Sequence, residues 1–124
     1  MIVLDTSAII ELIDGTEKGK SVQKHIADEA VGISAVTVNE LLIGARGEER
    51  IVIGDFVRSV HILPFDADAA YQSIQIEEVL KQKGRMIGKL DIFIAAICMV
   101  HKLPLLTTDK DFATVAELSV KVVA

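Results

Sequence analysis

Acidic residues stand at four separated places in this chain, and together they could hold a metal ion. The places are Asp5, Glu40, Asp91 and the pair Asp109 and Asp111. Asp5 directly follows the apolar run 2–4, and the pair follows Leu105-Leu106-Thr107, so both places lie just past short predicted strands rich in aliphatic residues. Parallel α/β domains bind their ligands beyond the carboxyl ends of the strands. The spacing therefore predicts that the acids meet in one cleft.

Each acid also has an interpretation that involves no ligand. Asp5 and Asp91 stand at the starts of predicted helices, where a carboxylate commonly caps backbone N–H groups. Asp109 and Asp111 fit an ordinary turn. Glu40 is harder to explain in this way, because it lies off the apolar stripe of its helix and has small neighbours. The coincidence of all four places favours the metal site, since crowded carboxylates repel one another unless cations compensate them.

The donor types indicate which metal such a site would hold. Carboxylate oxygens completed by water suit Mg²⁺ and Mn²⁺. Zinc is disfavoured, because the chain has a single cysteine and its histidines, His25, His61 and His101, are scattered without ligand spacing. The sequence also has no phosphate-cradling glycine loop and no nucleophile elbow of the G-x-S-x-G type. We therefore expect Mg²⁺ or Mn²⁺ as the cofactor.

Length and composition predict one soluble domain over residues 1–124. The longest apolar run, 92–100, is too short to span a membrane and contains Cys98, which we expect to be a buried, unreactive thiol. The N-terminus has no basic segment of the kind that begins a signal peptide, so a cytoplasmic location is expected. The hydrophobic content of 51% indicates strands covered on both faces, or an apolar surface reserved for a partner.

The net charge of −5 argues against nucleic-acid binding by charge alone. If four or five carboxylates bind cations, however, the remaining surface is nearly neutral. Four cations lie within nine residues just before Asp91 and are candidates for holding a nucleic-acid backbone: Lys81, Lys83, Arg85 and Lys89. They could equally be the solvated end of a helix, where positive charge suits the dipole. Arg46 and Arg50 form a second candidate group.

Strand and helix patterns alternate along the chain, which predicts an α/β fold with parallel pairing and right-handed crossovers. Strands are expected at 2–5, 32–34, 60–63, 105–107 and 120–123. Helices are expected at 8–13, 18–30, 35–45, 48–58, 66–83, 90–101 and 112–117, with Thr6 and Ser7 capping the first. No internal repeat or linker divides the chain.

Four motifs resemble, in order, those of the PIN domain family. They are Ile2-Val3-Leu4-Asp5-Thr6-Ser7, Val38-Asn39-Glu40-Leu41, the stretch 87–96 around Asp91, and Leu106-Thr107-Thr108-Asp109-Lys110-Asp111-Phe112. Within that family the chain looks most like the compact VapC-type toxin ribonucleases of toxin–antitoxin pairs. The resemblance implies a three-layer α/β/α sandwich on a parallel sheet of strand order 3-2-1-4-5, and Mg²⁺- or Mn²⁺-dependent endoribonuclease activity.

The resemblance also implies roles for individual residues. Asp5, Glu40, Asp91 and Asp109 match the catalytic and metal-binding acids of the family, and Asp111 matches a further acid that assists in many members. The spacer between the last two acids is short here, which leaves open which of them is the closer ligand. The hydroxyl residues Thr6, Ser7 and Thr107 are candidates for hydrogen bonds to these carboxylates. The implied partners are an RNA substrate, a cognate antitoxin and a second copy of the chain in a homodimer.

Three other interpretations remain at this point. An RNA-processing PIN nuclease would share the same acids and the same metal chemistry. A catalytically silent PIN-like scaffold would use the fold only to bind a partner. A receiver-type phosphoacceptor is also a small acidic α/β domain, but it requires a lysine at a late strand end, whereas the strand at 60–63 ends at Pro64.

Overall fold

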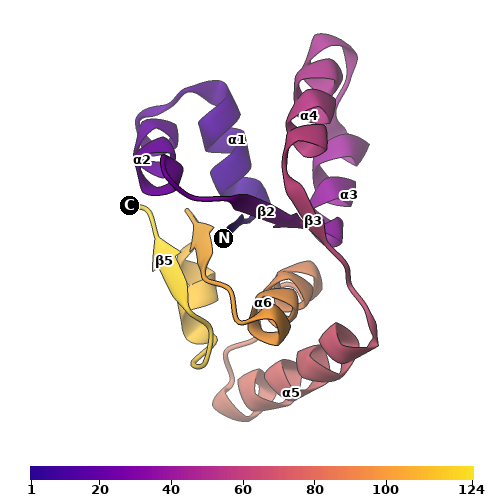
Figure 1. Ribbon diagram of the computed structural model, residues 1–124. Helices are drawn as coiled ribbons and strands as arrows, with labels where there is room; N and C mark the ends of the chain where they lie inside the picture. Colours follow the sequence, from indigo (N-terminus) through magenta and orange to yellow (C-terminus); the bar gives the residue numbers. More distant parts are fainter.

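The computed structural model describes residues 1–124 and contains a five-stranded parallel sheet of order β3-β2-β1-β4-β5 (Figure 1). The strands are β1 Ile2–Leu4, β2 Val31–Ser34, β3 His61–Leu63, β4 Leu105–Thr107 and β5 Val120–Val122. The α-helices are α1 Thr6–Asp14, α2 Glu17–Ile26, α3 Ala35–Gly44, α4 Gly47–Ser59, α5 Ala67–Lys83 and α6 Lys89–His101. A short 3₁₀ helix, η1 Lys110–Thr114, precedes β5. The predicted fold class and strand order are confirmed.

The alternation of side chains along the strands divides the hydrophobic core into two layers. Val3 and Leu105 point to the face that α5, α6 and Phe112 cover. Leu4 and Leu106, one position further along, point to the opposite face, which α1 to α4 cover. All four of these strand side chains are 0% exposed. Helices therefore cover both faces of the sheet, which accounts for strands that are apolar throughout.

The register of the central strands places the first and last acidic motifs side by side. Leu4 of β1 pairs with Leu106 of β4, and the Asp5 N–H donates to the Leu106 carbonyl at 3.4 Å. Asp5, which follows β1, and Thr107, the last residue of β4, therefore lie at the same edge of the sheet. Because β1 also pairs with β2 on its other side, Asp5 lies between the start of α3 and the end of β4.

Several predicted boundaries were wrong, each for a local reason. Thr6 and Ser7 do not cap α1; they are its first two residues, and Asp5 caps it instead of extending β1. The helix predicted at 18–30 ends at Ile26, because the Ala30 carbonyl accepts from the Ile2 N–H and already belongs to the sheet. The helix predicted at 112–117 is a single 3₁₀ segment that begins earlier, at Lys110.

The structure places Cys98 in the core at 0% exposure, and burial raises the pKa of its thiol to about 12. None of the helices is long and apolar enough to cross a membrane.

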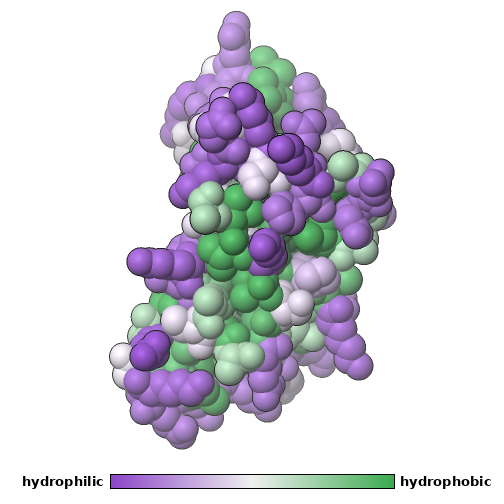
Figure 2. Space-filling view, turned by 90° about the vertical axis from the view of Figure 1, so that its left-hand side faces the viewer, coloured by the Kyte–Doolittle hydropathy of each residue, from purple (hydrophilic) through white to green (hydrophobic).

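Large apolar side chains also remain on the surface, notably Ile43 and Ile51 on α3 and α4, and Tyr71 and Ile74 on α5. Figure 2 shows a hydrophobic band between hydrophilic ends on the side that carries α2 and β5.

Candidate active site

Asp5 is the most deeply buried acid of the site, at 3% exposure. One carboxylate oxygen, Oδ1, accepts from the Ala8 N–H at 3.0 Å and so caps α1. The other, Oδ2, accepts from the Thr107 hydroxyl at 2.8 Å, while the Ser7 hydroxyl lies 2.9 Å from both oxygens. Burial raises the pKa of Asp5 in spite of these donors, and the charge of Asp109 raises it further. Asp5 is thus both a helix cap and a member of the acidic site.

Two hydroxyl residues connect the strand ends around Asp5. Thr107 donates to Asp5 and accepts from the Asp109 N–H at 3.0 Å, so it contacts two of the acidic residues. Ser7 accepts from the Thr108 N–H at 3.2 Å and also lies 3.3 Å from the Thr107 hydroxyl. These hydrogen bonds fix the end of β4 against the start of α1.

Glu40 reaches the site from α3, which begins at the end of β2. Ser34 caps this helix by accepting from the Thr37 N–H at 2.9 Å. The Thr6 hydroxyl donates to Glu40 Oε1 at 2.7 Å, which joins α3 to the first residue of α1. The hydroxyl residues at 6 and 7 therefore serve two different acids, Glu40 and Asp5.

Asp91 is the third residue of α6 and is partly buried. The capping role considered for it was wrong, because Gly88 occupies the N-cap position. Burial is the largest cause of a pKa raised to about 6, followed by the charges of Asp109, Glu40, Asp5 and Asp111. The charges of all four other acids thus raise the pKa of Asp91, so Asp91 is the acid whose electrostatic surroundings include the other four.

The two acids after β4 differ in their coupling to the rest. Asp109 caps η1 by accepting from the Asp111 N–H at 2.9 Å, and its charge raises the pKa of both Asp5 and Asp91. Asp111 is exposed, has the smallest effect of the four on Asp91, and is not among the causes of the Asp5 shift. Asp109 is therefore the more closely coupled of the pair.

The five carboxylates of the site lie in one region of the protein, but their present arrangement does not enclose a cation. No three acidic, histidine or cysteine side chains lie close enough together to form a complete metal-binding group. The donor chemistry nevertheless fits a hard divalent cation, because all five side chains offer carboxylate oxygens. A cation would also relieve the like-charge repulsion that raises the pKa of Asp91.

Three of the cations considered for nucleic-acid contact are engaged within the protein. Lys89 donates to both carboxylate oxygens of Glu77, at 3.0 and 2.9 Å. Arg46 donates to the Ile43 and Ala45 carbonyls, and Arg50 donates to the Leu42 carbonyl, so both arginines satisfy the end of α3. Lys81, Lys83 and Arg85 are exposed and form no ion pair. Sequence reasoning missed Glu77, since its pairing across 12 positions follows from helix packing and leaves no periodic signal.

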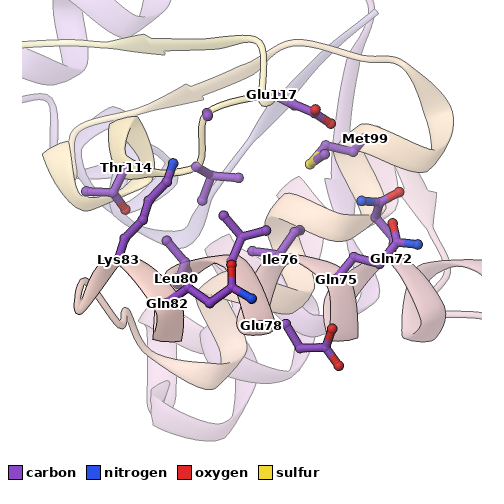
Figure 3. Close-up of a pocket in the computed structure, with 13 residues that line it drawn as sticks. Gln72, Gln75, Ile76, Glu78, Leu80, Gln82, Lys83, Met99, Thr114 and Glu117 are labelled. Carbon is purple, nitrogen blue, oxygen red and sulfur yellow. The ribbon is translucent and has the colours of Figure 1, made fainter.

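A cavity of about 530 Å³ lies away from the acids, between α5 and the segment that follows η1 (Figure 3). Gln72, Ile76 and Lys83 of α5 line it, together with Thr114 and Glu117. None of the five acids does. We place the site at the carboxylates because their position is set by the strand ends and their charges are coupled, neither of which is true of the cavity.

Fold and site together define a class of protein: a parallel α/β/α domain with carboxylates gathered at the strand ends. Residues 2–118 match the PIN domain, and the chain belongs to that family. It is 31% identical over 118 residues to "Ribonuclease VapC5" of Mycobacterium tuberculosis, covering 90% of this chain and 84% of the relative. It is 33% identical to "Ribonuclease VapC" of Rickettsia bellii, covering 96% and 93%.

A solved structure gives the same result. The crystal structure of VapBC-5 from Mycobacterium tuberculosis, a member of the VapBC family of toxin–antitoxin systems, superimposes with a TM-score of 0.76. Identity there is 28%, and 98% of this chain and 95% of that chain are covered. The predicted family, with VapC ribonucleases among its relatives, is confirmed, and the receiver-type interpretation was wrong.

Proposed function

We propose that this chain is a Mg²⁺- or Mn²⁺-dependent endoribonuclease that acts as the toxin of a toxin–antitoxin pair. The observation that carries the proposal is that the charges of four other carboxylates, on α3 and just after β1 and β4, act on Asp91. Membership of the PIN domain family and relatives named as ribonucleases support it. The small all-oxygen donor set favours a hard divalent cation over zinc.

Each acidic residue has a role in this proposal. Asp5, Asp91 and Asp109 bind the cation, Glu40 orients water, and Asp111 assists from the exposed side. When bound, the cation would lower the pKa of a water molecule and offset the charge that develops on the phosphate. Thr107 and Ser7 hold the Asp5 carboxylate in place, and Thr6 holds that of Glu40. No side-chain nucleophile is required.

The substrate in this proposal is single-stranded or loop RNA, since a rigid duplex would not easily bring one phosphate among recessed carboxylates. Lys81, Lys83 and Arg85 remain available for the backbone phosphates, because they form no ion pair in the protein. Replacing Lys83 with alanine should weaken substrate binding and lessen its salt dependence, with little change in kcat. Lys24→Ala, an exposed lysine on α2, is the matched control.

The proposed partner is a cognate antitoxin whose tail crosses the acidic site and places a cation, preferably Arg, among the carboxylates. The solved relative is itself a toxin–antitoxin complex. The exposed apolar side chains of α3, α4 and α5 offer surface for such a partner and for a second copy of the chain.

Cleavage of a labelled single-stranded RNA in Mn²⁺ and in EDTA tests the activity. Asp5→Asn should lower the rate by at least about 100-fold, because it removes a ligand that both binds the cation and positions the water. Asp28→Asn, an exposed acid in the turn after α2, should cleave like the wild type. If Asp5→Asn cleaves as fast as the wild type in saturating Mn²⁺, the nuclease proposal fails. A silent partner-binding scaffold then takes its place, as the incomplete enclosure of a cation would allow.

A further inference from the structure

The first turn of α6, which carries Asp91, lacks the side-chain cap that holds other helix starts. The α1, α2, α3 and α5 helices each begin with a side chain that accepts a backbone N–H of the first turn: Asp5, Thr16, Ser34 and Asp66. The α6 helix begins at Lys89, and its N-cap residue Gly88 has no side chain that could accept such a bond. The α4 helix, which follows Arg46, also lacks a side-chain cap. No side chain accepts from the backbone N–H groups of the first turn of α6. The first helical hydrogen bond there is the one from the Ile92 N–H to the Gly88 carbonyl, at 3.1 Å.

Apolar burial does little to anchor this turn either. Residues 84–88, between α5 and α6, lie outside regular helix or strand, and all but Ile87 are exposed. Lys89 is exposed and Leu90 is 44% exposed. Ile87, just before the helix, is partly buried against the core, and the first fully buried side chain of α6 is Ile92, at 1% exposure, one residue beyond Asp91. A helix start with so few buried contacts frays easily unless something else fixes it.

Lys89 forms the contact that fixes the first turn of α6. Its ammonium group donates to both oxygens of Glu77, at 3.0 and 2.9 Å, and so connects the first residue of α6 to the middle of α5. Glu77 is well placed for this, because its neighbours Ile76 and Leu80 are 5% and 1% exposed and fix α5 in the core. The Glu77 side chain is itself only 25% exposed. The hydrogen bond from Lys89 also lowers the pKa of Glu77.

We propose that Glu77 and Lys89 are positioning residues for the metal site. The ion pair holds the first turn of α6 against α5. This first turn then keeps Asp91 directed toward the other carboxylates. This inference rests on the proposed function in one respect, namely that Asp91 helps to bind a divalent cation.

Metal affinity separates this clamp from a simple effect of charge. If the two residues acted only through their charges, removing the negative Glu77 would weaken the binding of a divalent cation, and removing the positive Lys89 would strengthen it. If the pair acts by position, both Glu77→Gln and Lys89→Gln weaken binding. We expect a loss of about three- to tenfold for each, between the value of an exposed ion pair and that of a side chain that orients a metal ligand. The double variant should lose no more than either single variant, because the two residues act as a unit.

The experiment measures Mn²⁺ affinity by titration calorimetry on the full chain, and hydrogen exchange of the Ile92 amide without metal. Both single variants should speed exchange at Ile92 and leave Ile97, deeper in α6, unchanged. Glu17→Gln and Lys20→Gln on α2 are the controls, since they break an exposed ion pair far along the sequence from Asp91. Neither control should change affinity or exchange.

A Lys89→Gln variant that binds Mn²⁺ as tightly as the wild type, or more tightly, overturns the clamp. Unchanged exchange at Ile92 in both variants does the same. If the wild type binds no Mn²⁺, the proposed function fails, and the exchange measurement alone decides whether the pair holds the turn.

Discussion

The Thr107 hydroxyl donates to Asp5 Oδ2 at 2.8 Å and accepts from the Asp109 N–H at 3.0 Å. The side chain of one fully buried residue thereby joins Asp5 to Asp109, which lies 104 positions later in the sequence. Because a hydroxyl has one proton to donate and two lone pairs to accept, Thr107 can serve both at once. The geometry of the acidic site depends on this residue as well as on the acids.

Thr107→Val should destabilise the protein, because valine keeps the shape of the side chain but removes one of the donors to Asp5 and leaves the Asp109 N–H without its acceptor. We expect a loss of about 1–3 kcal/mol in the free energy of unfolding, the usual cost of leaving a buried polar group unpaired. Urea denaturation at neutral pH measures it. Thr108→Val is the matched control, because only the backbone N–H of Thr108 bonds to the site. Equal stability of the two variants would contradict the role given to the Thr107 hydroxyl.

Asp91→Asn should stabilise the metal-free protein at pH 7.5 and have little such effect at pH 3.5. Burial and then like charges raise the pKa of Asp91 from 3.8 to about 6 in the folded state, so above pH 6 folding must hold an ionised, partly buried carboxylate among like charges. Below pH 3.8 the group is protonated in both states and the cost vanishes. The stability difference between variant and wild type should therefore grow as pH rises from 3.8 to 6 and then level off. Chemical denaturation in EDTA at several pH values checks this; a constant difference across that range would refute it.

Mg²⁺ or Mn²⁺ should raise the melting temperature of the wild type, because a ligand that binds only the folded state stabilises it. At a concentration 100 times the Kd the gain is about 2.7 kcal/mol. Asp91→Asn should lose most of this increment, whereas Asp28→Asn should keep it. Identical wild-type melting curves in EDTA and in millimolar Mn²⁺ would count heavily against a metal site.

Asp109→Asn should lower cleavage more than Asp111→Asn. Asp109 is coupled to both Asp5 and Asp91, whereas Asp111 is exposed and affects Asp91 least. Asparagine can still cap η1, so the fold should survive the first substitution. We expect a loss of about 100-fold for Asp109→Asn and a smaller loss for Asp111→Asn. Single-turnover rates in saturating Mn²⁺ measure both, and the reverse order would make Asp111 the closer ligand.

The chain should form a homodimer, because it keeps large apolar side chains such as Ile43, Ile51 and Tyr71 on its surface. Sedimentation equilibrium should give twice the chain mass of 13.4 kDa. A monomer at tens of micromolar would remove this prediction.

The sequence by itself determined the parallel sheet, the order of the elements and the acids at the strand ends. These features follow from local patterns: apolar runs predict buried strands, and residues that follow parallel strands meet at one edge of the sheet. Asp5 and Asp109 could be placed in this way because each lies within two residues of a strand end.

Only the tertiary structure decided which side chains pair across elements. Thr6 contacts Glu40, which lies 34 positions later in the sequence. Lys89, which the sequence offered as a candidate for RNA contact, pairs with Glu77 instead. Arg46 and Arg50 turn to the end of α3. Such pairings depend on how helices pack and which rotamers then fit, and residue spacing along one element does not encode either. The same is true of Asp91, whose pKa is raised first by burial and then by four charges that lie after β1, on α3 and after β4.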